Sequence, residues 1–336
     1  MKKHLKKLMI YGAAGYTAGM VVEHAAAAGL DLVLAGRDKN RAELEAMAAR
    51  LGAEVRLFAV DDAAAIERAF EGISVLMNAA GPFGITAEPL MVSAIECGVH
   101  YLDFSAELDT YRRALALDAR ARAAGVMLLP GSGGSVAMLG SLAGHAIARA
   151  LAPRRIDVAL HVAGGLSRGS ALSAQQNLIT QTLQLVDGRL VPGNPAGIRD
   201  FDFGQGPKSS FPVTLPDLLT IQLATGVADI GTFVHLSSGT FSSGETSKLA
   251  VGPSKQERES NRYQAAVEVT DADGTVLRSV LDTVNGYSFT AMAAAEAARR
   301  VLTGEVRPGF QTPVGMFGNG FAETIADTHI SDVSQR

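Results

Sequence analysis

Short apolar runs alternate with longer amphipathic stretches over residues 7–129. The runs are rich in Val, Leu and Ile, as expected of strands that are buried on both faces of a parallel sheet. They are residues 8–11, 32–35, 55–59, 75–78, 101–103 and 126–129. The stretches between them have helical periodicity and are residues 18–28, 39–51, 63–70, 89–97 and 110–124, with another helix expected at 137–151. This order predicts an α/β fold, with a Rossmann-type parallel sheet and helices on both of its faces.

The pattern changes after Pro153, where glycine, serine and proline become frequent. The β-patterned runs 156–162 and 233–237 have no regular helices between them, which is typical of a mixed α+β domain. Residues 247–262 are polar and charged and indicate an exposed connection. Residues 264–269 and 276–284 flank a turn and predict a β-hairpin.

The alanine-rich residues 288–303 predict a helix that returns to the first domain. We therefore expect three parts in the chain. They are a Rossmann dinucleotide-binding domain at 1–152, an inserted α+β substrate or dimerisation domain at 153–286, and a C-terminal helix and tail at 287–336.

Composition narrows the possible functions. The 336 residues, of which 47% are hydrophobic and 19% charged, suit a globular protein of two domains. The net charge of -4, without clustered Lys and Arg, argues against nucleic-acid binding. No apolar run is long enough for a membrane span or a signal peptide, and the single cysteine, Cys97, suits a reducing cytoplasm. No set of His, Cys and carboxylate residues has metal-ligand spacing, so we expect no metal.

A glycine-rich turn lies directly between the first expected strand and the first expected helix, and it reads Tyr11-Gly12-Ala13-Ala14-Gly15-Tyr16-Thr17-Ala18-Gly19. In such a turn Gly12 permits a sharp bend, Gly15 lets the backbone approach a pyrophosphate, and Ala18 lets the helix pack close to the strand. The helix N-terminus offers free N–H groups and a partial positive charge. The turn predicts dinucleotide binding by Gly12, Ala14, Gly15, Tyr16 and Thr17, the alternative being a tight turn that binds nothing.

The second expected strand ends in Ala35-Gly36-Arg37-Asp38. An acidic residue at this tip favours NAD, whereas the guanidinium of Arg37 suits the 2′-phosphate of NADP, so Gly36 and Arg37 favour NADP over NAD. Asp38 is alternatively a helix cap. Asp61 and Asp62 follow the third strand, where Asp61 is our candidate for the adenine amino group and a cap is again the alternative.

The fourth expected strand leads into Asn78-Ala79-Ala80-Gly81-Pro82-Phe83-Gly84, at the edge of the sheet where ligands of open α/β folds bind. Small residues permit close approach there. We expect Asn78, Ala79 and Gly81 to line the nicotinamide ribose, with Pro82 and Phe83 shaping the pocket for the ring.

These segments together resemble the saccharopine dehydrogenase-like oxidoreductases, which include saccharopine reductases and trans-acting enoyl reductases. The first turn resembles the family's Y-G-A-T-G-Y-T-G, the 35–38 tip its A-G-R-D, and residues 78–83 its N-x-x-G-P-F. Residues 100–107, HYLDFSAE, resemble H-Y-x-D-x-x-G-E with Ala106 in place of glycine. Residues 129–135 stand where the family has G-F-D-S-x-P-S-D, but lack its aromatic and acidic residues. The resemblance implies an NADP-binding oxidoreductase.

A residue that exchanges a proton during hydride transfer must lie near the carboxyl edge of the sheet or face it from the second domain. The candidates are Tyr101, Asp103 and Glu107, with Ser105 nearby. Each has a structural alternative: a buried tyrosine with a satisfied hydroxyl, an aspartate that accepts bonds from loop amides, and a glutamate that caps the next helix. His145 and His161, amid apolar neighbours, are expected to be structural.

The expected function is NADP-dependent hydride transfer between NADPH and a C=N or C=C bond of a small metabolite. The alternatives are a dehydrogenase of a hydroxy or amino acid, and a non-catalytic NADP-binding regulatory or partner subunit. A Tyr-x-x-x-Lys pair is absent, which argues against a conventional short-chain dehydrogenase. The β-rich second domain favours a homodimer.

Overall fold

The computed structural model describes residues 6–171, 181–237 and 251–333, which form two compact units. The first unit consists of Met1–Ser105, Asp109–Gly134 and Thr290–Thr312. The second consists of Ala106–Leu108, Ser135–Phe289 and Pro313–Arg336. Most of the second unit is therefore inserted between two segments of the first. The C-terminal segment divides, because residues 290–312 belong to the first unit and the following residues to the second.

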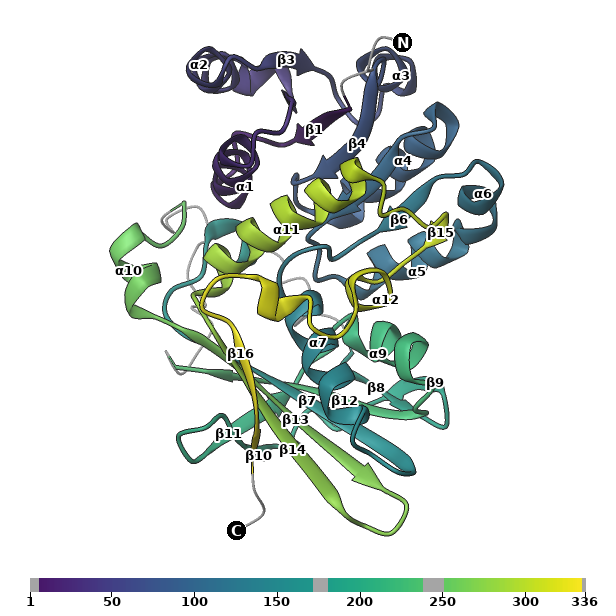
Figure 1. Cartoon of the computed structure of the whole chain (residues 1–336), viewed down its shortest axis with the longest axis vertical. Helices are drawn as coiled ribbons and strands as arrows, with labels where there is room; N and C mark the ends of the chain where they lie inside the picture. The colour runs from purple at the N-terminus through teal and green to yellow at the C-terminus, as the bar shows by residue number, and fades with distance from the viewer. Residues whose placement is uncertain (1–5, 172–180, 238–250, 334–336) are drawn as a thin grey trace. The chain divides into compact units, whose positions relative to one another are not determined.

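The first unit contains a seven-stranded sheet in the order β15-β6-β5-β4-β1-β2-β3, and every neighbouring pair is parallel (Figure 1). Its strands are β1 (Lys7–Tyr11), β2 (Leu32–Gly36), β3 (Glu54–Leu57), β4 (Ile73–Asn78), β5 (His100–Asp103), β6 (Met127–Leu129) and β15 (Gly309–Phe310). Strand β1, which lies inside the sheet between β4 and β2, has no exposed side chain at Leu8, Met9 or Ile10, because both faces of the sheet are covered. The predicted Rossmann-type fold with an inserted second domain is confirmed.

The helices of the first unit follow the predicted order with different bounds. They are α1 (Tyr16–Ala27), the 3-10 turn η1 (Asp38–Asn40), α2 (Arg41–Leu51), α3 (Ala63–Ala69), α4 (Phe83–Cys97), α5 (Leu108–Ala116), α6 (Asp118–Ala123) and α11 (Gly286–Thr303), of which α11 begins in the second unit. The prediction that Pro89 opens the fourth helix is wrong, because Pro82 caps that helix and Pro89 lies inside it. The helix expected at 110–124 is divided at Leu117 into α5 and α6.

The second unit is built on a mixed sheet in the order β10-β11-β12-β7-β13-β14-β16, with β8 and β9 branching from β12. Its strands are β7 (Pro153–Val162), β8 (Leu183–Val186), β9 (Arg189–Pro192), β10 (Arg199–Asp202), β11 (Pro207–Pro212), β12 (Asp229–Leu236), β13 (Tyr263–Asp271), β14 (Val276–Thr283) and β16 (His329–Val333). Strands β7 and β12 are parallel, and β13 and β14 form the predicted antiparallel hairpin.

The helices of the second unit that lie wholly within the described residues are α7 (Ser135–Ile147), α9 (Asp217–Thr225), α10 (Lys255–Ser260) and α12 (Pro313–Phe317), followed by the 3-10 turn η3 (Ala322–Thr324). Helix α7 packs along β7, β13 and β14, and α9 packs on α7 and β12. The connection predicted at 247–262 lies partly outside the described residues. Its described part contains α10, which forms because Ser254 and Glu257 make a reciprocal capping box.

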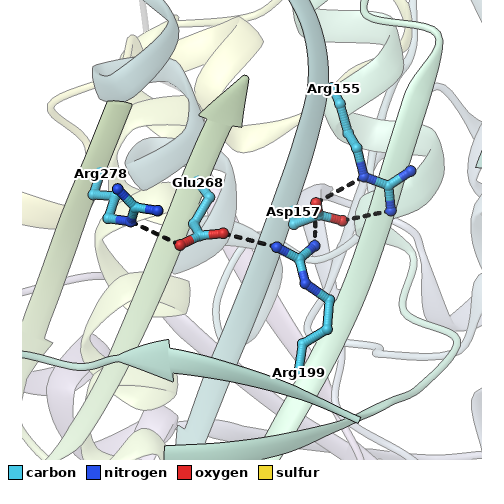
Figure 2. Close-up of polar contacts among 5 residues, drawn as sticks. All are labelled: Arg155, Asp157, Arg199, Glu268 and Arg278. Atoms are coloured by element: carbon cyan, nitrogen blue, oxygen red, sulfur yellow. Dashed lines mark hydrogen bonds and ion pairs between the residues drawn. The ribbon is translucent and has the colours of Figure 1, made fainter. Parts of the chain in front are cut away.

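Strand β10 crosses a face of this sheet and is fastened there in two ways. Its Phe201 packs into a buried cluster with Phe203, Phe233, Ala159 and Ala266. Its neighbouring Arg199 lies between the carboxylates of Asp157 and Glu268 and binds both (Figure 2). Arg155 holds Asp157 through two further bonds of 2.8 Å, and Arg278 binds Glu268 at 2.8 Å. The arginines and carboxylates alternate, so each carboxylate has two cationic neighbours.

Candidate functional site

The turn between β1 and α1 is built for close backbone approach. Gly12 has a φ of 85°, which disfavours any other residue type, and a Cβ atom there would lie 2.8 Å from the Cβ of Ala80. The backbone N–H of Ala79 donates to the carbonyl of Tyr11 at 2.8 Å. The loops that follow β1 and β4 therefore lie against each other at the carboxyl edge of the sheet. Gly12 is required there because a side chain would separate them.

Helix α1 begins at Tyr16 with the exposed Gly15 as its N-cap, and no side chain caps it. The N–H groups of a first helical turn have no partners within the helix, so this end can bind an anion. Ala18 is buried, which explains why a third glycine is not needed for close packing. Ala14 and Thr17 are partly exposed beside this end. These features fit a pyrophosphate.

The two charged residues at the tip of β2, Arg37 and Asp38, differ in their partners. Asp38 forms an ion pair with Arg41 at 2.6 Å, whereas the exposed side chain of Arg37 has no hydrogen bond or ion pair within the described parts of the chain. Asp62 is the cap of α3, because its carboxylate accepts the N–H of Ala65 at 2.9 Å. Arg37 is thus an exposed cation at this tip that is not paired with Asp38.

The hydroxyl of Tyr11 lies within the electrostatic influence of two charged groups, Arg37 and Asp61. Burial raises the pKa of the Tyr11 hydroxyl, while the nearby Arg37 lowers that pKa and Asp61 raises it. Its ring stacks on Phe58 with centroids 4.7 Å apart. The structure therefore brings Arg37 and Asp61 close to the same side chain, at the end of the sheet where the adenosine half of a dinucleotide is expected.

The loop after β4 carries the residues expected beside the nicotinamide. Asn78 is fully buried, Ala79 and Pro82 are partly exposed, and Gly81 is exposed. The peptide bond between Gly81 and Pro82 is cis. Phe83, at the start of α4, meets the ring of Phe104 edge to face with centroids 5.8 Å apart.

Tyr101 and Asp103 are brought together, but both are completely buried. The Tyr101 hydroxyl donates to Asp103 Oδ2 at 2.8 Å. Asp103 Oδ1 accepts bonds from the N–H of Gly131 and from the N–H and hydroxyl of Ser105, at 2.8–2.9 Å. Burial raises the pKa of Asp103 to about 6, against these donors, which lower it. Burial also raises the pKa of Tyr101 well above its usual value. These contacts fit the structural alternative given above for each residue.

Glu107 lies in the second unit, where its partly exposed carboxylate accepts the backbone N–H of Ala106 at 2.9 Å. His161 is held by Gln264 at 2.7 Å and Ser237 at 2.5 Å, and burial lowers its pKa. His145 pairs with Asp332. Both histidines therefore have the structural surroundings that their apolar neighbours predicted.

Sequence reasoning missed the turn after β6 as a part of this edge. The N–H and hydroxyl of Ser132 both donate to the carbonyl of Asp103, at 2.7 and 2.8 Å. A Cβ atom on Gly133 would come within 2.7 Å of the carbonyl oxygen of Thr290 in α11. The turn is glycine-rich because a helix backbone fills the space beside it. The departure from the family motif at 129–135 was the signal that could have pointed to this.

Within the described residues, no group of three or more His, Cys, Asp and Glu side chains is arranged to hold a metal ion. None of the helices in the described ranges is both long and apolar enough to cross a membrane.

Residues 8–129 match the family model described as "Saccharopine dehydrogenase NADP binding domain". The chain is similar to apo saccharopine dehydrogenase (L-Glu forming) from Saccharomyces cerevisiae, with a TM-score of 0.67 and 13% identity over 98% of this chain and 100% of that one. It is also similar to homospermidine synthase from Legionella pneumophila in complex with NAD, with a TM-score of 0.71 and 10% identity over 98% and 91%. A search of curated protein sequences gives no match.

At these identities the likeness to solved structures shows the fold. The family model confirms the resemblance over the nucleotide-binding part, so residues 8–129 are a nicotinamide-dinucleotide-binding domain of the dehydrogenase type.

Proposed function

We propose that this chain, whose residues 8–129 match the saccharopine dehydrogenase NADP-binding domain model, is an NADP-dependent oxidoreductase acting on a C=N or C=C bond of a small metabolite. The observation that carries the proposal is the pairing of a phosphate-binding turn with an unengaged arginine at the tip of β2. Bound NADPH supplies the hydride. The chain's own residues bind and orient the two halves of the molecule.

Each part of the edge has a distinct task in this proposal. The turn at Gly12 and Gly15 and the N-terminus of α1 hold the pyrophosphate. Arg37 binds the 2′-phosphate, and Asp61 accepts a bond from the adenine amino group. The loop of residues 78–83 lines the nicotinamide ribose and ring. Of the three residues predicted as catalytic, Glu107 has a partly exposed carboxylate, so we propose it as the proton donor.

Nucleotide selectivity is the first test. Arg37→Ala removes a charge-assisted contact worth about 1.5–3 kcal/mol, so NADPH should bind roughly ten- to a hundredfold more weakly while NADH binding is unchanged. Fluorescence titration of both reduced nucleotides measures this. Arg68→Ala, which changes an exposed arginine of α3, is the matched control and should leave both affinities unchanged. Equal affinities of wild type and Arg37→Ala for NADPH would contradict the assignment.

Turnover is the second test. Loss of NADPH absorbance is followed over a panel of imines, enones and enoyl esters, with Glu107→Gln compared with wild type on any substrate found. The expected result is turnover by wild type and a kcat reduced about 10²- to 10⁴-fold in Glu107→Gln. An unchanged kcat would remove Glu107 from the role of proton donor. Activity only with NADP in the oxidative direction would favour a dehydrogenase of a hydroxy or amino acid.

A non-catalytic NADP-binding partner subunit is the second candidate. It is favoured by the burial of Tyr101 and Asp103, whose polar atoms are engaged with each other and with nearby loops. Tight NADPH binding without turnover on any member of the panel, together with a stoichiometric enzyme partner in a pull-down, would establish this function instead.

We also propose a homodimer formed through the second unit. The β-patterned run 233–237 belongs largely to β12, which lies inside the sheet. An edge-to-edge contact would therefore use the outer strands β10 or β16. Sedimentation equilibrium at several concentrations tests the proposal, and a single species of one chain's mass would refute it.

A further inference from the structure

A continuous chain of hydrogen bonds runs along the carboxyl edge of the first unit. It starts at the N–H of Gly131, which donates to Asp103, and passes to the hydroxyl of Tyr101, which donates to the same carboxylate. The side-chain amide of Asn78 donates to Tyr101 and to Thr86, at 3.1 Å each. The loops after β4, β5 and β6 are thus joined by buried side chains.

The chain ends on the backbone of the loop beside the nicotinamide position. Thr86 donates to the carbonyl of Ala80 at 2.6 Å, and the N–H of Ala80 donates to Asn78 Oδ1 at 3.1 Å. Both backbone groups of Ala80 are therefore held by side chains of the network. Ala80 is also the residue that Gly12 approaches, so the network fixes the wall against the phosphate-binding turn.

The bonding pattern leaves Tyr101 no donor for a substrate. Its single hydroxyl proton is directed at Asp103 and its oxygen accepts from Asn78. Asp103 accepts hydrogen bonds from four donors, and its side chain is completely buried. Such a fully satisfied buried network rigidifies the elements that it joins.

We propose that Tyr101 and Asp103 are positioning residues that, through Asn78 and Thr86, hold the loop of residues 78–82 in the shape that receives the nicotinamide half of the cofactor. The proposal rests on the proposed function, because it assumes that the edge binds NADP. It assigns to these two residues a role in cofactor geometry instead of proton transfer.

The test compares two ligands that share one half. NADPH reaches the wall, whereas 2′,5′-ADP carries the adenosine and its 2′-phosphate and lacks the nicotinamide. Tyr101→Phe keeps the buried ring and removes the hydroxyl, which leaves Asn78 and Asp103 without a partner at that point. We expect NADPH to bind about tenfold more weakly, equivalent to about 1.4 kcal/mol, and 2′,5′-ADP to bind as in wild type. Isothermal titration calorimetry measures both ligands.

Two further variants protect the test from a general loss of structure. Tyr111→Phe is the matched control, because Tyr111 is equally buried and its hydroxyl donates to the carbonyl of Ser105 instead of to the carboxylate of Asp103. It should change neither affinity. Thr86→Val frees the carbonyl of Ala80 from the other end of the network, and should weaken NADPH selectively as Tyr101→Phe does.

The outcomes are distinct. Selective weakening of NADPH in Tyr101→Phe and Thr86→Val supports the positioning role. Unchanged NADPH affinity in both variants, or equal weakening of both ligands, overturns it. If wild type binds neither NADPH nor 2′,5′-ADP, the proposed function itself fails. If wild type binds NADPH but the variants show no selective weakening, only the positioning role fails.

Discussion

Asp217 lies in the first turn of α9 with its carboxylate completely buried. Neither of its oxygens accepts a hydrogen bond from another residue in the described ranges, and the nearby hydroxyl of Thr220 is also unpartnered there. Because an ionised carboxylate without partners is costly to bury, burial raises the pKa of Asp217 from 3.8 to about 7. We predict that Asp217→Asn removes the pH dependence of stability that this group imposes, so that the effect of the substitution on stability changes sign between pH 4 and pH 8.

The sign follows from proton binding. The folded state holds the proton of Asp217 up to about pH 7, whereas the unfolded state releases it near 3.8, so the stabilisation is complete below 3.8 and is lost as the pH rises to about 7. Over about three pH units, at about 1.4 kcal/mol each, the loss from this one group is about 4 kcal/mol. Asparagine carries no charge at either pH, so Asp217→Asn should be destabilising at pH 4, where its amide has no partners, and stabilising at pH 8.

The assay is urea unfolding of wild type and variant from pH 4 to pH 8, followed by far-UV circular dichroism and by tyrosine fluorescence, since the chain has no tryptophan. The difference between the two proteins should change by about 4 kcal/mol across the range. Asp200→Asn is the control, because Asp200 is exposed in the same unit and accepts a bond from Ser209 that an amide oxygen can replace. A constant difference between wild type and Asp217→Asn would refute the reasoning.

Three other outcomes are expected. Gly12→Val should weaken NADPH binding more than tenfold in a fluorescence titration, because the valine side chain would meet Ala80 and strain a backbone with positive φ. Unchanged affinity would show that NADPH binding does not need the close approach of residue 12 to Ala80. Asp157→Asn should lower the stability of the second unit by about 2–3 kcal/mol in thermal unfolding, since Arg155 and Arg199 lose the buried carboxylate that they share. A change below about 0.5 kcal/mol would mean that water takes the place of the carboxylate. Gly133→Ala should cost about 1–3 kcal/mol in the same assay because its Cβ would press on the carbonyl of Thr290, and a neutral effect would show that α11 yields easily.

The nucleotide-binding part was predictable because its signals are local. Strands buried on both faces are continuous apolar runs, as in β1, and the glycine turn follows β1 directly in the sequence. Arg37 could be named as a candidate from the sequence for the same reason, since it stands at the end of an apolar run. The sequence does not predict that Arg37 forms no ion pair with Asp38, because Asp38 pairs with Arg41 instead.

The second unit was predicted only in outline. Strand β10 has the sequence RDFD, with one apolar residue, and its place in the fold is decided by Phe201 and Arg199 reaching residues far away in the chain. The alternation of apolar and polar residues that predicts a strand is too short here to identify β10. The capping box of Ser254 and Glu257 is different, because its spacing is a recognised helix signal that was overlooked within a polar stretch.

The role of Asp103 shows the limit most clearly. The sequence placed it at a strand tip beside the expected ligand, where a catalytic acid and a structural acceptor are equally consistent with the residue type. The backbone N–H groups of Ser105 and of Gly131, which is 28 residues further along the chain, identify it as an acceptor of loop amides.

The parallel sheet of the first unit is not completed until almost the whole polypeptide has been synthesised. Its outer strand β15 pairs with β6 through backbone bonds of 2.8 Å, yet it comes from Gly309–Phe310. During translation, the edge of β6 that pairs with β15 therefore stays unpaired until the inserted unit has emerged from the ribosome. A truncated gene encoding residues 8–129 alone, the segment matched by the family model, would leave that edge permanently open, so aggregation of such a fragment is to be expected even though its phosphate turn is intact.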